Sequence, residues 1–304
     1  MRTFFHTCVL IPEMNKYGLI LICLLFHYSF QAVSSEPKAP SSNENLTENL
    51  KKTCVDQLSP YKSFFKKNDL NSSCTKALVL KNCQSVNGTP IFHFDDLSQS
   101  KDKTKNKAKN ILVISLIHGD ETPAGSLGRY WVERLEKIQP RNNWRIIPVM
   151  NPDGVALKTR TNANGVDLNR NFPTKDWDEK AIEFWKKEGS SSKRRFPGNS
   201  GGSEPEVKCL LDHVAEYKPD FVMSIHTPLK VLDFDGPHVK PPIYSYLPWR
   251  RLGNFPGSLG RLLWVEQGVP VLTTELTDQV PTTVTPFEQL QDVIGELVQK
   301  ELKK

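Results

Sequence analysis

Four side chains in this sequence have the types and spacing that metal-assisted hydrolysis requires: His118, Glu121, His226 and Glu275. Two imidazoles and one carboxylate, with a fourth position left open for water, form the usual ligand set of a catalytic zinc ion. A glutamate beside such an ion can act as a general base. We therefore interpret His118, Glu121 and His226 as candidate zinc ligands and Glu275 as the candidate base.

Spacing alone does not establish this site. A lone histidine is more often a structural residue than a metal ligand, and Glu275 could instead pair with a nearby arginine. The stronger indication is position, because His118, His226 and Glu275 each directly follow an apolar run. The carboxyl ends of parallel strands meet at one edge of a sheet, where ligands of α/β proteins bind.

Apolar runs alternate with helical patterns from residue 111 onward. The expected strands are 111–117, 144–149, 221–225 and 269–274, and the expected helices are 124–138, 203–217 and 286–303. This order predicts an α/β fold: a single domain with a mixed, mostly parallel, twisted sheet and helices on both faces. A helix over 47–66 and a hairpin over 80–94 should precede this core. Ser203–Glu206 has the sequence of a helix capping box.

Composition divides the 304-residue chain into three segments. A short basic start, an apolar run and small residues three apart predict a signal peptide over 1–34, with an uncleaved anchor as the alternative. The apolar run is shorter than the ~20 residues of a bilayer span, so we expect no stable membrane span after cleavage. We expect a disordered leader over 35–46 and the catalytic domain over 47–304.

The overall charge is unremarkable for a globular protein. Hydrophobic residues make up 38% and charged residues 24%, and the net charge is +6. This small, scattered excess does not indicate a nucleic-acid partner.

Four cysteines would remain after the signal peptide is removed: Cys54, Cys74, Cys83 and Cys209. An even number in an exported protein suggests disulfides, with three full pairings possible. Cys209 lies opposite the apolar stripe of the predicted helix 203–217. We therefore predict that Cys209 pairs with one of the other three and ties the N-terminal extension to the catalytic body.

Several motifs in order resemble the carboxypeptidase A-like zinc metallocarboxypeptidase family. They are His118–Glu121, Asn151–Gly154, Arg160, Asp167–Phe172, Ser203–Glu206, Ser224–His226 and Thr274–Leu276. The resemblance runs from about Leu80 to the C-terminus. It departs from the classical digestive members in one respect, because no tyrosine securely matches their mobile tyrosine before the catalytic glutamate.

The resemblance implies a role for each matching residue. His118, Glu121 and His226 would bind one zinc ion per chain, and Asp167 would fix the tautomer of His118. Glu275 would be the general base and Arg160 would stabilise the oxyanion. Asn169 and Arg170 would hold the substrate's terminal carboxylate.

The motifs are most similar to those of bacterial murein peptide amidases. The resemblance implies a carboxypeptidase, and the predicted signal peptide implies that it is exported and is periplasmic or secreted. We expect a monomer. It would act on small peptides, including peptidoglycan-derived ones with a γ-D-glutamyl-diaminopimelate bond. The alternatives are a general carboxypeptidase for ordinary L-peptides, a zinc deacylase, or an inactive peptide-binding module.

Two finer predictions follow from the resemblance. The family's unusual cis peptide corresponds here to Thr227-Pro228, where proline makes the cis form less costly. The segment before Glu275 that lines the family's specificity pocket corresponds to Gly260–Leu263. Arg261 is thus a candidate for binding a second carboxylate of the substrate, such as that of diaminopimelate. The alternative is that Arg261 faces solvent.

Overall fold

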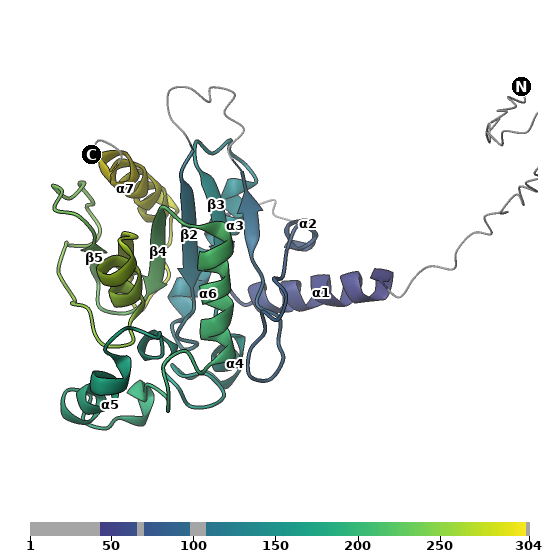
Figure 1. Cartoon of the computed structure of the whole chain (residues 1–304). Coiled ribbons are helices and arrows are strands. Elements are labelled where there is room, and N and C mark those ends of the chain that lie inside the picture. Colours follow the sequence, from purple (N-terminus) through teal and green to yellow (C-terminus); the bar gives the residue numbers. More distant parts are fainter. Residues whose placement is uncertain (1–42, 66–69, 98–107, 302–304) are drawn as a thin grey trace, which may run out of the picture. The chain divides into compact units, whose positions relative to one another are not determined.

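The computed structural model describes residues 43–65, 70–97 and 108–301 (Figure 1). The predicted signal peptide, 1–34, and most of the predicted leader lie outside these residues. Helix α1 (Asn43–Leu58) begins inside the predicted leader and ends earlier than predicted. The early end has a local cause, because Pro60 disfavours helical backbone in the residue before it. Among the described helices, none has both the length and the apolar character needed to cross a membrane.

A six-stranded sheet organises the fold, in the order β1-β3-β2-β4-β6-β5. The four inner strands are parallel, and β1 and β5 are antiparallel edges. The strands are β1 (Phe94–Asp96), β2 (Asn110–Ser115), β3 (Asn143–Ile147), β4 (Phe221–His226), β5 (Val231–Asp235) and β6 (Val271–Glu275). The predicted mixed, mostly parallel sheet is confirmed.

Helices pack on both faces of this sheet, as predicted (Figure 1). After α1 the helices are α2 (Leu70–Cys74), α3 (Thr122–Leu135), α4 (Pro152–Leu157), α5 (Trp177–Lys187), α6 (Pro205–Tyr217) and α7 (Thr285–Glu301). Shorter turns span Leu168–Arg170, Lys193–Arg195 and Arg261–Glu266.

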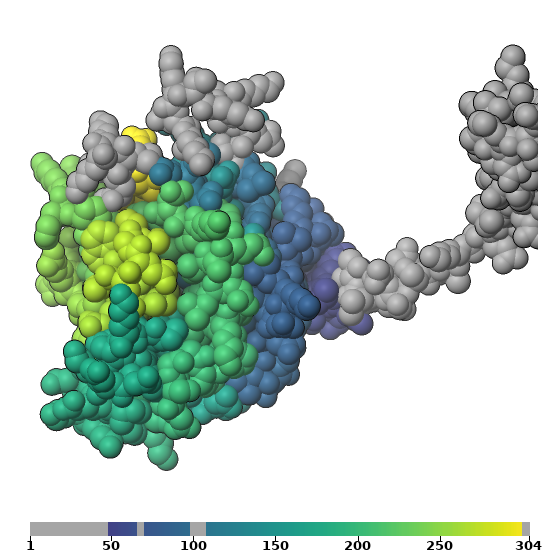
Figure 2. All heavy atoms as spheres, viewed as in Figure 1, coloured from purple at the N-terminus to yellow at the C-terminus, as the bar shows by residue number. Residues whose placement is uncertain are grey.

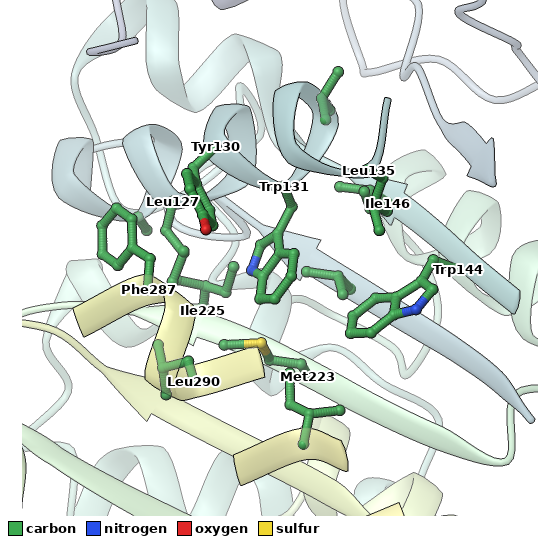
Figure 3. Packing of buried hydrophobic residues seen from close by; sticks show 14 of the residues in the cluster. Leu127, Tyr130, Trp131, Leu135, Trp144, Ile146, Met223, Ile225, Phe287 and Leu290 are labelled. Atoms are coloured by element: carbon green, nitrogen blue, oxygen red, sulfur yellow. The ribbon is translucent and has the colours of Figure 1, made fainter. Parts of the chain in front are cut away.

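The sheet separates two hydrophobic cores because side chains alternate along each strand. On β2, Ile111 and Val113 belong to the core formed with α1, α3 and α7. Figure 3 shows part of this core, including side chains of α3 and α7. Leu112 and Ile114 belong to the core formed with α6 and the 261–266 turn. A strand buried on both faces must be apolar throughout, which is why the sequence showed a continuous apolar run there.

Four elements of this architecture were not predicted: the helices α2, α4 and α5 and the edge strand β5. The predicted hairpin over 80–94 is present only as two isolated antiparallel bridges, Gln84 to Pro90 and Leu78 to His93. The predicted capping box at Ser203–Glu206 is also absent. Glu204 is the N-cap of α6, and the buried carboxylate of Glu206 instead accepts hydrogen bonds from Asn162 and the Val86 backbone.

Two disulfides bind the N-terminal extension, Cys54–Cys74 and Cys83–Cys209. The prediction that Cys209 ties the extension to the catalytic body is confirmed, although Cys209 is buried rather than exposed. It is buried because the segment around Cys83 lies against α6. Figure 2 shows this contact as blue atoms beside the green atoms of α6.

His93 and His213 form a buried pair beside Arg145. Neither histidine was predicted to have a catalytic role. Their ring centroids lie 4.8 Å apart, and His213 Nδ1 lies 3.4 Å from the guanidinium of Arg145. Asp95 and Glu216 hold that guanidinium in ion pairs. Burial, together with Arg145, lowers the pKa of His93 to about 4 and that of His213 to about 3. Both imidazoles are therefore neutral in the folded protein.

The neutral pair predicts acid sensitivity. Unfolded histidines have a pKa near ~6.5 and bind protons that the folded pair does not, so stability should fall as the pH drops below that value. Each histidine should contribute a slope of up to about 1.4 kcal/mol per pH unit. Chemical denaturation between pH 7 and 5 should show a shallower slope for His213→Gln than for wild type. The exposed His238→Gln is the control, and an unchanged slope in His213→Gln would contradict the account.

The two disulfides should contribute unequally to stability. Cys83–Cys209 closes a sequence separation of 126 residues and Cys54–Cys74 one of 20, and longer loops lose more entropy in the unfolded state when closed. Replacing both Cys83 and Cys209 by serine should lower the free energy of unfolding by about 2–5 kcal/mol. The Cys54/Cys74 double variant is the matched comparison. A larger loss in that variant would refute the ranking.

Candidate active site

Three buried side chains direct their donor atoms to one point at the carboxyl edge of the sheet. The donor atoms of His118, Glu121 and His226 all lie within 4.8 Å of one another. His118 Nδ1 is 2.8 Å from Glu121 Oε1, and His226 Nδ1 is 3.1 Å from both His118 Nδ1 and Glu121 Oε2. The predicted ligand set is therefore brought together.

Hydrogen bonds on the outer side of each ring indicate which nitrogen carries the proton. His118 Nε2 lies 3.1 Å from Asp167 Oδ1, and His226 Nε2 lies 3.0 Å from Ser224 Oγ. With Nε2 donating in each ring, both Nδ1 atoms present lone pairs to each other and to Glu121. Such facing acceptors need a cation between them, and two imidazoles with one carboxylate suit zinc.

The carboxylates of this site stay ionised. Burial opposes ionisation of Glu121, but the imidazoles of His118 and His226 outweigh it and hold its pKa well below the usual value. For Asp167, burial is outweighed by Arg160 and His118, and its pKa is also well below the usual value. Both groups are therefore available as anions for binding a cation and orienting its ligands.

Close backbone packing fixes the turn that carries His118 and Glu121. A side chain at Gly119 would overlap the backbone of Gly154 and Val155, so only glycine allows the two loops to touch. Glu121 then directly precedes α3, and its Oε2 accepts a hydrogen bond from the Thr227 backbone at 3.1 Å. The peptide after Thr227 is cis, as predicted.

Asp167 connects the ligand set to the predicted substrate-binding residues. Its second oxygen accepts a hydrogen bond from Arg160 Nε at 2.8 Å, and Oδ1 also accepts one from the Asn169 backbone. Arg160 also reaches Glu121, at 3.5 Å. Arg170 directly follows Asn169. Its guanidinium carbon lies 4.8 Å from the centroid of the Phe255 ring, and the guanidinium forms no ion pair with a carboxylate of the described residues. Its guanidinium is free to bind an anion.

Glu275 reaches the same cleft from the neighbouring strand. The parallel register pairs it with His226, which places both residues at the ends of β4 and β6. The cleft has a volume of about 930 Å³. Its walls include seven of the nine predicted residues: His118, Glu121, Arg160, Asn169, Arg170, His226 and Glu275. Asp167 lies behind this wall, fully buried.

The structure does not bring Arg261 to the cleft. Its guanidinium forms two contacts with Asp176, from Nε at 2.9 Å and from Nη2 at 2.6 Å. It does not line the cavity. Asp176, in the loop before α5, was not recognised from the sequence as a partner, so the prediction that Arg261 binds a substrate carboxylate was wrong.

Sequence reasoning missed two acidic residues of β5 that line the cleft, Asp233 and Asp235. The signal was present as the alternation Val231–Asp235, with aspartates two residues apart, but polar residues at such spacing usually face solvent. No tyrosine is among the described residues that line the cleft. Tyr244 is buried and donates a hydrogen bond to the Pro286 carbonyl instead.

Comparisons with known proteins agree with this geometry. Residues 68–235 match the family described as zinc carboxypeptidase. Murein peptide amidase A of Escherichia coli K12 is 31% identical over 155 residues, which cover 49% of this chain and 59% of that relative. Murein peptide amidase A of Vibrio campbellii is 31% identical over 205 residues, covering 64% and 77%. This chain therefore matches less than two thirds of the Escherichia coli relative's length.

Among solved structures, bovine thrombin-activatable fibrinolysis inhibitor, in complex with tick carboxypeptidase inhibitor, has the same fold. It superposes with a TM-score of 0.58 at 16% identity, over 85% of this chain and 96% of that one. Carboxypeptidase A of Helicoverpa armigera has a TM-score of 0.50 at 18% identity, over 82% and 74%. Since the family match spans more than half of the sequence, this chain belongs to the zinc carboxypeptidase family, whose members are peptide hydrolases.

The position of Glu275 predicts separable effects on binding and turnover. Glu275→Gln removes the base but none of the three metal donors, so the variant should fold and bind one zinc ion. Its kcat should fall by about 10²–10⁴. Metal content by mass spectrometry and peptide turnover test this, with the exposed Glu179→Gln as control. Full activity in Glu275→Gln would refute the assignment of the base.

Proposed function

We propose that this protein is an exported zinc-dependent carboxypeptidase that hydrolyses the C-terminal amide bond of small peptides. Its preferred substrates would be murein peptides with a γ-D-glutamyl-diaminopimelate bond. The observation that carries the proposal is that one cleft contains the three candidate metal donors, the carboxylate of Glu275 and the guanidinium of Arg170, and that neither of these two groups has an ion-pair partner among the described residues. An endopeptidase would have no use for the guanidinium, because its substrates have no free carboxylate next to the cleaved bond.

The free guanidinium of Arg170 supplies recognition of a chain terminus. It lies in the cleft beside Asn169, and one of its nitrogens donates to the Asn169 carbonyl at 2.7 Å. The Asn169 side-chain oxygen accepts a hydrogen bond from the Leu259 backbone, which leaves its amide NH₂ for the substrate. A planar guanidinium and an amide together can bind both oxygens of a carboxylate.

The chemistry requires activation of water and stabilisation of negative charge. A zinc ion held by His118, Glu121 and His226 would supply Lewis acidity for both. Glu275 would accept the proton of the attacking water and pass it to the leaving amine. Arg160, held by Asp167, would donate to the oxygen that gains charge as the amide carbon becomes tetrahedral.

The narrower assignment to murein peptides rests on relatives. Two curated relatives, from Escherichia coli and Vibrio campbellii, are named murein peptide amidase A. Export is supported by the two disulfides, which form in oxidising compartments. We propose a periplasmic or secreted monomer that binds one zinc ion and a small peptide.

Activity assays on two peptides test the function. The purified protein should release diaminopimelate from L-Ala-γ-D-Glu-diaminopimelate, and a chelator should abolish release until zinc is restored. Hydrolysis of α-linked L-peptides alone would replace the murein assignment with a general carboxypeptidase. Release of an acyl group with no requirement for a terminal carboxylate would indicate a deacylase, and no hydrolysis at all would refute an enzymatic role.

Arg170 should control the requirement for a free terminus. Arg170→Ala should raise KM at least tenfold for a peptide with a free terminal carboxylate and change little for the same peptide with an amidated terminus. The control is Arg141→Ala, at an exposed site outside the cleft. If Arg170→Ala affects both peptides equally, the guanidinium supports the fold and does not read the terminus.

A further inference from the structure

A second cavity, the side cavity, adjoins the catalytic cleft at Arg160. It has a volume of about 500 Å³, and Arg160, Trp185 and Arg194 line both cavities. Asn169 and Arg170, which would hold the terminal residue of a substrate, line the cleft but not the side cavity. The side cavity is therefore left for the part of a substrate that precedes the cleaved bond.

Two lysines give the side cavity its charge. Lys158 and Lys193 are exposed lining residues, and neither forms an ion pair with a carboxylate of the described residues. A third cation, Arg194, is already paired with Asp120. Among the described residues, no aspartate or glutamate lines this cavity. The side cavity thus offers two ammonium groups to an anion.

Backbone hydrogen bonds fix the position of Lys158. It ends α4 in the left-handed conformation, with φ at 54°, and its N–H donates to the Gly154 and Val155 carbonyls. The next N–H, of Thr159, also donates to the Gly154 carbonyl, at 2.9 Å. Glycine or asparagine is usual at such a helix end, so a lysine there indicates a use for its side chain.

An aromatic pair forms the apolar wall of the same cavity. The ring centroids of Trp185 and Phe196 lie 5.1 Å apart, with the rings at 64° to each other. Trp185 Nε1 donates to the Ser192 carbonyl at 2.7 Å, which holds the indole against the loop that carries Lys193. A short methylene chain can pack on such a wall while its charged end reaches the lysines.

The γ linkage of the proposed substrate supplies a ligand of this kind. When D-glutamate is joined through its γ-carboxyl group, its α-carboxylate stays free. Two methylenes and the α-carbon separate that carboxylate from the carbonyl carbon of the cleaved bond. An α-linked residue has no backbone carboxylate to offer, because its α-carboxyl group is part of the cleaved bond. A free α-carboxylate is therefore the mark of the γ linkage.

On the basis of the proposed function, we propose that Lys158 and Lys193 bind the free α-carboxylate of the γ-linked residue before the cleaved bond. Arg160, between the two cavities, would donate to the oxygen of the cleaved amide, so a carboxylate held beyond it helps to align that amide. Charge-assisted hydrogen bonds favour a carboxylate over a carboxamide at this place. Because both lysines are exposed, an unfilled side cavity costs little, and the result is a preference rather than an absolute requirement.

Two matched peptides test this site, L-Ala-γ-D-Glu-diaminopimelate and L-Ala-γ-D-isoglutaminyl-diaminopimelate. They differ only in the α-carboxylate, which is a carboxamide in the second. Wild-type kcat/KM should be about five- to tenfold higher for the carboxylate peptide. The double variant Lys158→Met/Lys193→Met should lose this preference, while its release from the carboxamide peptide stays within about threefold of wild type. Added salt should also reduce the wild-type preference.

The control is Lys186→Met/Lys218→Met, which removes the same charge from exposed lysines that line neither cavity. Lys218 is matched to Lys158, since it also ends a helix, α6, in the left-handed conformation. This control should keep the wild-type preference. A preference retained in Lys158→Met/Lys193→Met overturns the site, and so does an equal loss in the control.

Equal wild-type kcat/KM for the two peptides would also overturn the site. Calorimetric binding of both peptides to zinc-loaded Glu275→Gln gives a readout without turnover. If neither peptide is hydrolysed, the proposed function fails. The ratio of the two affinities, with and without Lys158 and Lys193, then still decides whether the side cavity binds the α-carboxylate.

Discussion

The buried carboxylate of Asp167 is the interaction on which the site depends. It is completely inaccessible to solvent, and it accepts hydrogen bonds from His118, from Arg160 and from the Asn169 backbone. One anion thus orients the candidate metal ligand His118, the guanidinium of Arg160 and the start of the turn that carries Asn169 and Arg170, which we propose to bind the terminal carboxylate. Breaking one partner of such a buried group is costly, about 3–5 kcal/mol in comparable cases, so the three elements must be retained together.

The N-terminal extension is built into the same framework. Asp153 accepts hydrogen bonds from Ser85 Oγ and the Asn87 backbone, and Glu206 accepts one from the Val86 backbone. Together with the Cys83–Cys209 bond, these contacts fix the extension to α4 and α6. Because Gly154 and Val155 of α4 lie directly against Gly119, the extension supports, through α4, the turn that carries His118 and Glu121.

The sequence allowed prediction of the features with a strong local signal. Apolar runs located the inner parallel strands, and polar residues at the ends of those runs located the candidate metal donors and the candidate base. Strand β5 was missed because it is an edge strand whose aspartates face a cleft, and an inward polar row has the same sequence as a solvent-facing one. The direction of Arg261 depended on Asp176, 85 residues away in sequence, and a contact of that range leaves no local pattern. Burial of Cys209 was missed for the same reason, since the covering segment comes from a distant part of the chain.

The contact between Gly119 and Gly154 has a consequence for how this family can diversify. Gly119 lies in the turn that carries the candidate ligands His118 and Glu121, and Gly154 lies in the first turn of α4. Since the backbones touch, a side chain gained in the first loop would displace the second and move the imidazole of His118 with it. The ligand-bearing turn and α4 therefore tolerate little change, whereas substitutions on β5 and in the 252–260 segment can reshape the cleft without a direct contact to the candidate metal donors.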